Sequence, residues 1–304
     1  MIDFFQFFSS ALLIYFGAEF IIRHGKTLAF SLGVPRYIIG LTLISFGTSF
    51  PELVVNLNAS IINESDIAIG NIVGSNIANI ALVLPFAILI APLSVKKINF
   101  NTLAYFLLSA LFLIFFCLYG SLGRFEGLLL LFGFILFCFS IKKDAKNNMD
   151  RRSKVNSIDY YLILILVCSF FMLIIGSNLF IDSAISLANK LGVSKVAISL
   201  TMVALGTSLP ELATSVIAAI KKENDLLIGS IVGSNIMNIL LVLGSSILVN
   251  EISVLVDFMA LTIFLCVTVL IYIYTIYQIN FSRIIAFILL SIYLIFNYSI
   301  FINN

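Results

Sequence analysis

Two stretches of this chain carry polar residues at the same spacing within otherwise apolar sequence. Residues 47–80 read GTSFPELVVNLNASIINESDIAIGNIVGSNIANI, and residues 206–239 read GTSLPELATSVIAAIKKENDLLIGSIVGSNIMNI. Each stretch contains a proline, a carboxylate, hydroxyl side chains and asparagines. One such stretch could arise by accident, but its repetition predicts a shared chemical purpose.

The GTSFPE segment supplies oxygen atoms, and no sulfur or imidazole. A proline inside a helix removes one N–H and displaces the carbonyl four residues back, which here belongs to Gly47. We therefore expect a break that turns carbonyl oxygens out of the helix. Thr48 and Glu52 are four residues apart and share one face, and Ser49 adds a hydroxyl beside them.

The second copy supplies Thr207, Ser208 and Glu211 in the same way. A lone charge at a helix centre in the bilayer costs about 2.5–3.5 kcal/mol on insertion scales, so two facing carboxylates require something positive between them. Calcium prefers about six to eight oxygen ligands. The two segments together predict a hard-cation site in which one divalent ion, or sodium ions or protons instead, neutralise Glu52 and Glu211.

The segments GNIVGSN and GSIVGSN, which follow, are expected to complete the site from neighbouring spans. Ser75 and Asn79 are four apart, as are Ser234 and Asn238, so each pair can direct neutral oxygens at the glutamates. For Asn76 and Asn235, contacts between helices and ion binding are equally good interpretations. The small residues at a spacing of four favour close helix packing over ion binding; they are Gly70, Gly74, Gly229 and Gly233.

Composition places these segments in a membrane. Hydrophobic residues make up 61% of the chain, charged residues 11%, and the mean hydropathy is +1.16. Segments long enough to cross about 30 Å of hydrocarbon predict a polytopic all-α membrane protein. The ten predicted transmembrane segments are 3–22, 37–62, 67–91, 101–119, 125–141, 158–183, 196–220, 226–249, 253–277 and 284–301. Their length and their lack of alternation exclude a β-barrel.

The basic residues indicate how these ten spans are oriented. Alternate loops hold 14 and 3 of the 17 lysines and arginines. The positive-inside rule therefore places the first set in the cytoplasm and both termini outside, in a multi-pass protein of the cell membrane. Glu19 near the end of the first span is expected to pair with a cation or to reach the interface, rather than to bind the transported ion.

The two polar stretches belong to a repeat that covers both halves of the chain. A shift of 159 positions (206 − 47) relates them without a gap and also maps Gly17 onto Gly176. Each half holds five spans, an odd number, so the second copy enters the membrane from the opposite side, and such inverted repeats support alternating access. We predict an N-terminal repeat at 1–141, a basic cytoplasmic linker at 142–157 and a C-terminal repeat at 158–304.

The paired GTSxPE and GSNIxN motifs resemble the α-repeats of the cation/calcium antiporter superfamily, specifically the prokaryotic sodium/calcium exchangers. The resemblance covers both repeats and implies a secondary antiporter that carries Na⁺ and Ca²⁺, with no resident cofactor, no nucleic acid partner and no enzymatic activity. It implies that Glu52 and Glu211 bridge calcium with the backbone carbonyls of Thr48 and Thr207. It also implies sodium ligands, which share the glutamates and add Ser49, Ser75, Ser208 and Ser234 and the carbonyls of Ser45 and Ala204.

Two departures within the family define the expected subtype. Proton-coupled relatives carry G-N-x-x-E where this chain has GTSxPE, which favours sodium coupling. Potassium-dependent relatives carry aspartate at the position of Asn238, so asparagine here favours potassium independence. The family also implies three sodium ions per calcium ion, and hence electrogenic transport. The first and sixth spans are expected to slide as gates.

Three rival interpretations can be weighed against the residues. Exchange of calcium for protons stays open, because glutamates can bind protons. An intramembrane hydrolase using Ser49 or Ser208 lacks a base near the nucleophile, since the single histidine, His24, is at a span end. A channel would need a continuous pore, whereas the inverted repeat favours alternating access.

Overall fold

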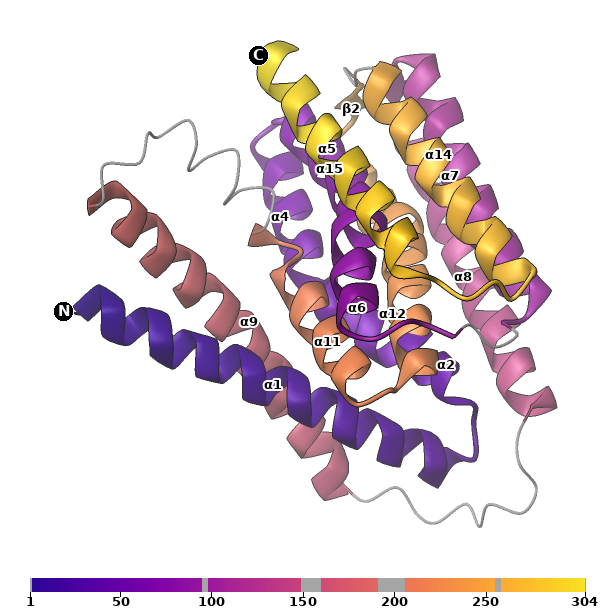
Figure 1. Cartoon of the computed structure of the whole chain (residues 1–304). Coiled ribbons are helices and arrows are strands. Elements are labelled where there is room, and N and C mark those ends of the chain that lie inside the picture. Colours follow the sequence, from indigo (N-terminus) through magenta and orange to yellow (C-terminus); the bar gives the residue numbers. More distant parts are fainter. Residues whose placement is uncertain (1, 95–97, 149–159, 191–205, 255–257, 304) are drawn as a thin grey trace.

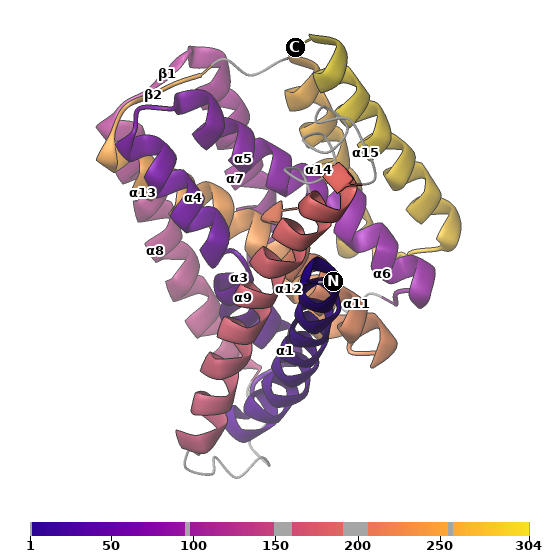
Figure 2. The same cartoon turned by 90° about the vertical axis from the view of Figure 1, so that its left-hand side faces the viewer.

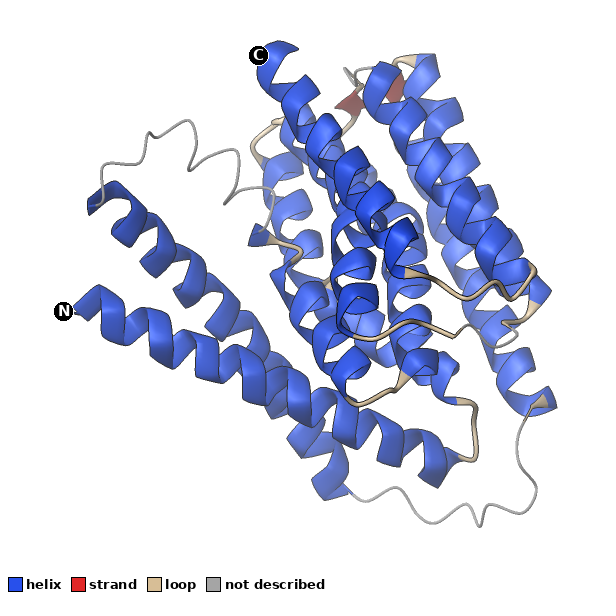
Figure 3. Cartoon of the chain, in the orientation of Figure 1, coloured by secondary structure: helices blue, strands red, loops and turns tan. Residues whose placement is uncertain are grey.

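The computed structural model is almost entirely helical (Figure 3). It describes residues 2–94, 98–148, 160–190, 206–254 and 258–303. Within these ranges, strands are limited to two residues each, β1 (Ser121–Leu122) and β2 (Ile252–Ser253). The predicted all-α membrane class is therefore confirmed.

The helices follow one another along the chain with short connections. They are α1 Ile2–Leu32, α2 Arg36–Ile39, η1 Gly40–Ile44, α3 Ser45–Thr48, α4 Phe50–Ile61, α5 Ser65–Ala78, η2 Asn79–Val83, α6 Leu84–Ile90, α7 Phe100–Tyr119, α8 Arg124–Asn147, α9 Tyr160–Lys190, α11 Leu209–Ile220, α12 Asn224–Met237, η3 Asn238–Leu243, α13 Gly244–Val249, α14 Phe258–Ile276 and α15 Arg283–Asn303; the η elements are π-helices.

Seven helices in the described part of the chain are long and apolar enough to cross a membrane. The bent pair Arg36–Thr48 and Phe50–Ile61 makes an eighth if it is one span, and Leu209–Ile220 and Arg283–Tyr298 are shorter apolar helices. All of them overlap predicted segments. The total of ten transmembrane spans stays a prediction.

The helix break predicted at GTSFPE is present at Ser49. This residue has ψ 5° and separates α3 from α4, which are part of a span bent by 44°. Pro51 falls in the first turn of α4, where a missing N–H costs no intrahelical hydrogen bond. Ser208 has nearly the same conformation (φ −87°, ψ 2°) before α11.

The three π-helices were not predicted from sequence. They begin at Gly40, Asn79 and Asn238. A π turn accommodates one extra residue within a helix and often occurs at functional sites. Two of them start at asparagines of the GSNIxN motifs, so the helix geometry changes where these side chains face the interior.

Several helices extend past the predicted membrane segments. The first predicted span ends at residue 22 and α1 at Leu32, and the fifth ends at residue 141 and α8 at Asn147. Hydropathy detects the apolar part of a helix, whereas the helix continues until a breaker such as Gly33, which has φ 65°. Residues 142–147 of the predicted linker are consequently helical.

Helices α1 and α9 lie side by side and run obliquely to the rest of the bundle (Figures 1 and 2). Their close approach needs glycine on both sides: a Cβ at Gly17 would lie 2.9 Å from the Leu173 nitrogen, and one at Gly176 would lie 2.9 Å from Leu13 Cβ. The core lies instead around Asn224–Val249 and Ser65–Ile90, whose most apolar windows are 94% and 83% buried.

The strand pairings obey the 159-residue shift. Leu122 pairs with Ile252 in the β1–β2 ladder, and Leu93 pairs with Phe281 in an isolated bridge. The shift maps Leu93 onto Ile252 and Leu122 onto Phe281, so each pairing is the counterpart of the other. The two halves thus reproduce the same long-range contacts as well as the same motifs.

Candidate cation site

The two predicted carboxylates are buried at the starts of equivalent helices. Glu52 lies in the first turn of α4 and is 0% exposed, and Glu211 lies in the first turn of α11 and is 4% exposed. The positive end of each helix dipole favours a negative charge there. Both oxygens of Glu52, and Oε2 of Glu211, have no hydrogen-bond partner within the described residues.

Hydroxyl groups connect the two copies around these carboxylates. Ser49 Oγ lies 3.5 Å from Glu211 Oε1, and so a residue beside the break in the first copy reaches the carboxylate of the second. Thr48 Oγ1 lies 3.5 Å from Ser234 Oγ, and Ser75 Oγ lies 3.4 Å from Thr207 Oγ1. These last two contacts are equivalent under the shift of 159 positions.

The motif asparagines line the same interior. Asn79 Nδ2 donates to Asn235 Oδ1 at 3.2 Å, which joins the two GSNIxN motifs directly. Asn76 Nδ2 donates to the Ile72 carbonyl of its own helix at 2.7 Å. Asn238 is fully buried, and neither atom of its amide has a hydrogen-bond partner among the described residues. An unpaired buried amide is costly, which is expected where a ligand occupies the space.

The remaining predicted ligands fall into three groups. The Ser45 hydroxyl donates to the carbonyls of Gly40 and Ser230 at 2.8 and 3.0 Å, so its side chain serves helix contact. Ser208 Oγ is buried with no partner in the described part of the structure. Ala204 lies outside the described residues.

Glycines 229 and 233 have the packing role predicted for them. A Cβ at Gly229 would lie 2.3 Å from the Tyr37 carbonyl oxygen, and one at Gly233 would lie 2.5 Å from that of Leu41. They let α12 approach the start of the GTS-bearing span, η1 included. This approach places Ser234 beside Thr48.

Two amides near the site were missed by the sequence analysis. Asn71 Oδ1 lies 3.4 Å from both Ser75 Oγ and Thr207 Oγ1, and Asn71 Nδ2 donates to Asn56 Oδ1 at 2.5 Å. Asn71 is four residues before Ser75, so helical spacing could have placed it on the face of the site. Its counterpart in the second copy is Ser230, and comparing motifs across the copies therefore concealed it.

The donor set consists of oxygen from carboxylate, hydroxyl and amide groups. No group of three or more histidine, cysteine, aspartate or glutamate side chains that could hold a metal occurs in the described part of the chain. Two carboxylates with neutral oxygens suit a hard cation that binds and leaves, such as calcium or sodium.

The comparisons with known proteins agree with this chemistry. The family model described as "Sodium/calcium exchanger protein" matches residues 2–142 and 161–302. This chain belongs to the sodium/calcium exchanger family. It is 32% identical over 281 residues to the sodium/calcium exchanger MaX1 of Methanosarcina acetivorans, covering 78% of this chain and 80% of that protein. It is 34% identical over 247 residues to the inner membrane protein YrbG of Escherichia coli, covering 77% and 75%.

The fold matches a solved exchanger as well. The sodium-calcium exchanger NCX_Mj superposes with a TM-score of 0.82 at 29% identity, covering 97% of this chain and 98% of that one. The resemblance stated from the motifs is thus confirmed. Because the family consists of membrane transporters, this exchanger-family chain is not an enzyme, and the intramembrane hydrolase interpretation falls.

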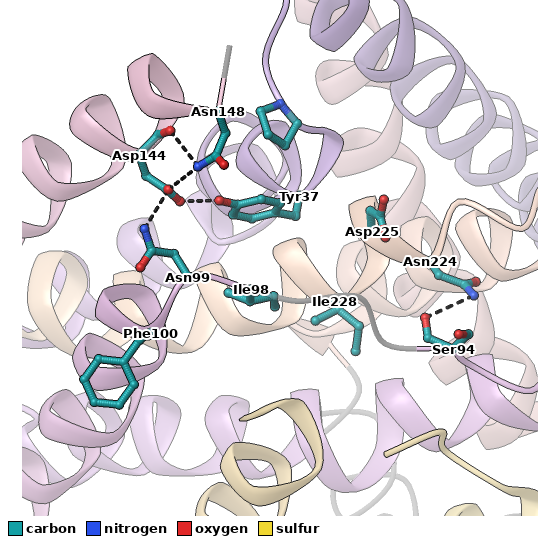
Figure 4. Close-up of a pocket in the computed structure, with 11 residues that line it drawn as sticks. Tyr37, Ser94, Ile98, Asn99, Phe100, Asp144, Asn148, Asn224, Asp225 and Ile228 are labelled. Atoms are coloured by element: carbon teal, nitrogen blue, oxygen red, sulfur yellow. Dashed lines mark hydrogen bonds between the residues drawn. The ribbon is translucent and has the colours of Figure 1, made fainter. Parts of the chain in front are cut away.

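A separate polar cavity of about 570 Å³ lies where α2 and α12 begin and α8 ends (Figure 4). Its buried Asp144 accepts hydrogen bonds from the Tyr37 hydroxyl and from the amides of Asn99 and Asn148. Asn224 donates to the Ser94 carbonyl at 3.5 Å across the same cavity. None of the residues lining it belongs to the predicted cation site.

Proposed function

We propose that this chain is a secondary antiporter that exchanges Na⁺ for Ca²⁺ across the cell membrane by alternating access. One observation carries the proposal: two buried carboxylates, one from each copy of the repeat, have oxygens without hydrogen-bond donors inside a shell of hydroxyl and amide oxygens. Two uncompensated charges at this depth are unfavourable unless a cation joins them. Family membership identifies the cations as sodium and calcium.

The exchange follows from competition for Glu52 and Glu211. A calcium ion neutralises both carboxylates at once, with the backbone carbonyls of Thr48 and Thr207 as further ligands. Sodium ions would divide the same carboxylates among them and recruit hydroxyls and carbonyls of the shell. The proposed sodium ligands besides the glutamates are Ser49, Ser75, Ser208, Ser234, Ser45 and Ala204, with Asn79 and Asn238 as polar groups that select among ions.

The proposed architecture has ten transmembrane helices in two inverted five-helix repeats, at 1–141 and 158–304, with a cytoplasmic linker between them. The equivalent breaks at Ser49 and Ser208 and the matched pairings of Leu93 and Leu122 support the repeat. The distribution of lysine and arginine supports cytoplasmic placement of the linker and an extracytoplasmic position for both termini.

Potassium independence and electrogenicity are part of the proposal. Asn238 offers a neutral amide where a third carboxylate would complete a site for an additional cation. With two carboxylates, three sodium ions in exchange for one calcium ion move net charge across the membrane.

The test uses the purified chain in liposomes loaded with sodium, with calcium outside and pH clamped by buffer and a protonophore. We expect isotopic calcium uptake that is unaffected by potassium and that responds to an imposed membrane potential. Uptake that needs a proton gradient and ignores sodium would establish calcium/proton exchange instead, and single-channel currents would establish a channel.

A further inference from the structure

Asn71 occupies a position between the candidate site and a second asparagine. Its Oδ1 lies 3.4 Å from Ser75 Oγ of its own helix and 3.4 Å from Thr207 Oγ1 of the other repeat copy. Its Nδ2 lies 2.5 Å from Asn56 Oδ1 on α4. One side chain thus contacts residues from three segments that surround the carboxylates.

The direction of this hydrogen-bond chain is fixed by a backbone carbonyl. Asn56 lies 3.0 Å from the carbonyl oxygen of Ala68, which can only accept, so Asn56 must present its NH₂ group there. Asn56 then has its oxygen left for Asn71, and Asn71 must donate to it. The remaining group of Asn71 is its oxygen, so Ser75 and Thr207 are the donors in their contacts with Asn71.

This direction prepares both hydroxyls to bind a cation. A hydroxyl has one proton and two lone pairs, so a proton directed at Asn71 leaves the lone pairs for a positive ion. The two hydroxyl oxygens lie 3.4 Å apart. Two oxygens bound at right angles to a calcium-sized cation at about 2.3–2.6 Å lie about 3.3–3.7 Å apart, and sodium is close to calcium in size.

The second copy of the repeat lacks this chain. The counterparts of Asn56 and Asn71 are Ser215 and Ser230. The Ser230 hydroxyl donates to Leu227 of its own helix at 2.9 Å, and Ser215 Oγ has no partner within the described residues. The two symmetric hydroxyl pairs, Ser75–Thr207 and Thr48–Ser234, are therefore held by different groups.

We propose that Asn71 is a positioning residue for sodium, which orients the Ser75 and Thr207 hydroxyls so that their lone pairs face the ion. This inference rests on the proposed function. Calcium, bound through carboxylates and backbone carbonyls, does not need these hydroxyls. Loss of Asn71 therefore separates the two ions: sodium binding weakens and calcium binding is retained.

The experiment measures sodium-driven calcium uptake in liposomes for the full chain while internal sodium and external calcium are varied separately. Asn71→Leu removes the acceptor at similar volume, and we expect the half-saturating sodium concentration to rise roughly tenfold, as for the loss of about one good hydrogen bond. Half-saturating calcium should change by less than about twofold. Asn71→Asp, which keeps an acceptor oxygen at the same reach, should restore sodium dependence to within about threefold.

The matched control is Ser230→Ala, the equivalent position in the other copy, which should leave both ion dependences unchanged. Asn71→Ala serves as a second deletion of the acceptor if the leucine variant does not purify as folded protein. Equal changes for sodium and calcium, or an unchanged sodium dependence, would overturn the assignment of Asn71. Absence of sodium-driven uptake in the unmodified chain would instead overturn the proposed function, so the two failures are distinguishable.

Discussion

The turn at residues 61–64 and its counterpart at residues 220–223 share a backbone conformation but differ in their charges. Asn63 and Lys222 are equivalent and have φ of 63° and 58°. In both turns the following glutamate N–H donates to the carbonyl five residues back, at 2.8 Å. Glu64 is exposed, whereas Glu223 is 6% exposed and pairs with Lys26 and Arg36, each at 2.6 Å.

A further ion pair strengthens the difference between the two turns. Lys221 lies 2.6 Å from Glu19 on α1, whereas the equivalent positions are Ile62 and Asn178. The pairing expected of Glu19 is thus confirmed. The comparison teaches that the repeat preserves backbone and site chemistry, while its charges bind the α11–α12 turn to α1 and α2.

The strongest test of equivalence between the copies replaces one site carboxylate at a time. Glu52→Gln and Glu211→Gln should each reduce calcium transport by roughly 100-fold or more, because losing one of two buried charges on a shared ion costs about 3–5 kcal/mol. Isotopic calcium uptake measures the loss, and size-exclusion profiles of the purified variants check folding. Retained transport in either variant would contradict a shared site.

Asn238 and Asn79 are equivalent positions with different contacts. Asn79 donates to Asn235, whereas the amide of Asn238 has no partner in the described part of the chain. Asn238→Asp should therefore change ion selection, shifting half-saturating sodium or conferring a potassium response by about tenfold, as a new charge–cation contact would. Asn79→Asp is the matched comparison. Identical uptake with and without potassium, at unchanged sodium dependence, would show that position 238 does not select ions.

The sequence was sufficient for the features that local chemistry determines. Pro51 and Glu52 predicted a break and a buried charge because proline cannot donate a hydrogen bond and a membrane carboxylate needs a partner. The role of Asn71 could not be inferred in the same way, because it depends on the approach of Thr207 from 136 positions away. The π-helices also escaped prediction, since no residue type enforces them as proline enforces a break.

The glycines at the α1–α9 crossing test the symmetry through packing. A Cβ at Gly17 or Gly176 would approach the opposite helix to 2.9 Å, so Gly17→Ala and Gly176→Ala should each destabilise the protein by about 1–3 kcal/mol. Thermal unfolding of the purified variants measures this. Gly133→Ala is the control, since a Cβ there would meet its nearest neighbour, Leu240, at an ordinary 3.5 Å. Equal behaviour of all three would show that the crossing tolerates movement.

The smallest effect should come from removing charge at the two turns. Glu223→Gln leaves Lys26 and Arg36 without their carboxylate, and these side chains are 50% and 45% exposed. The loss should therefore be about 1–2 kcal/mol, between the values for exposed and buried ion pairs.

Glu64→Gln is the matched control, and its unfolding midpoint should stay within error of the unmodified chain. The Glu223→Gln deficit should shrink in high salt, because salt screens the partly exposed cations in the unmodified chain. A deficit that is independent of salt would instead mean that Glu223 stabilises the turn through packing and its backbone hydrogen bond. The two turns would then differ in burial, and their charges would not be the cause.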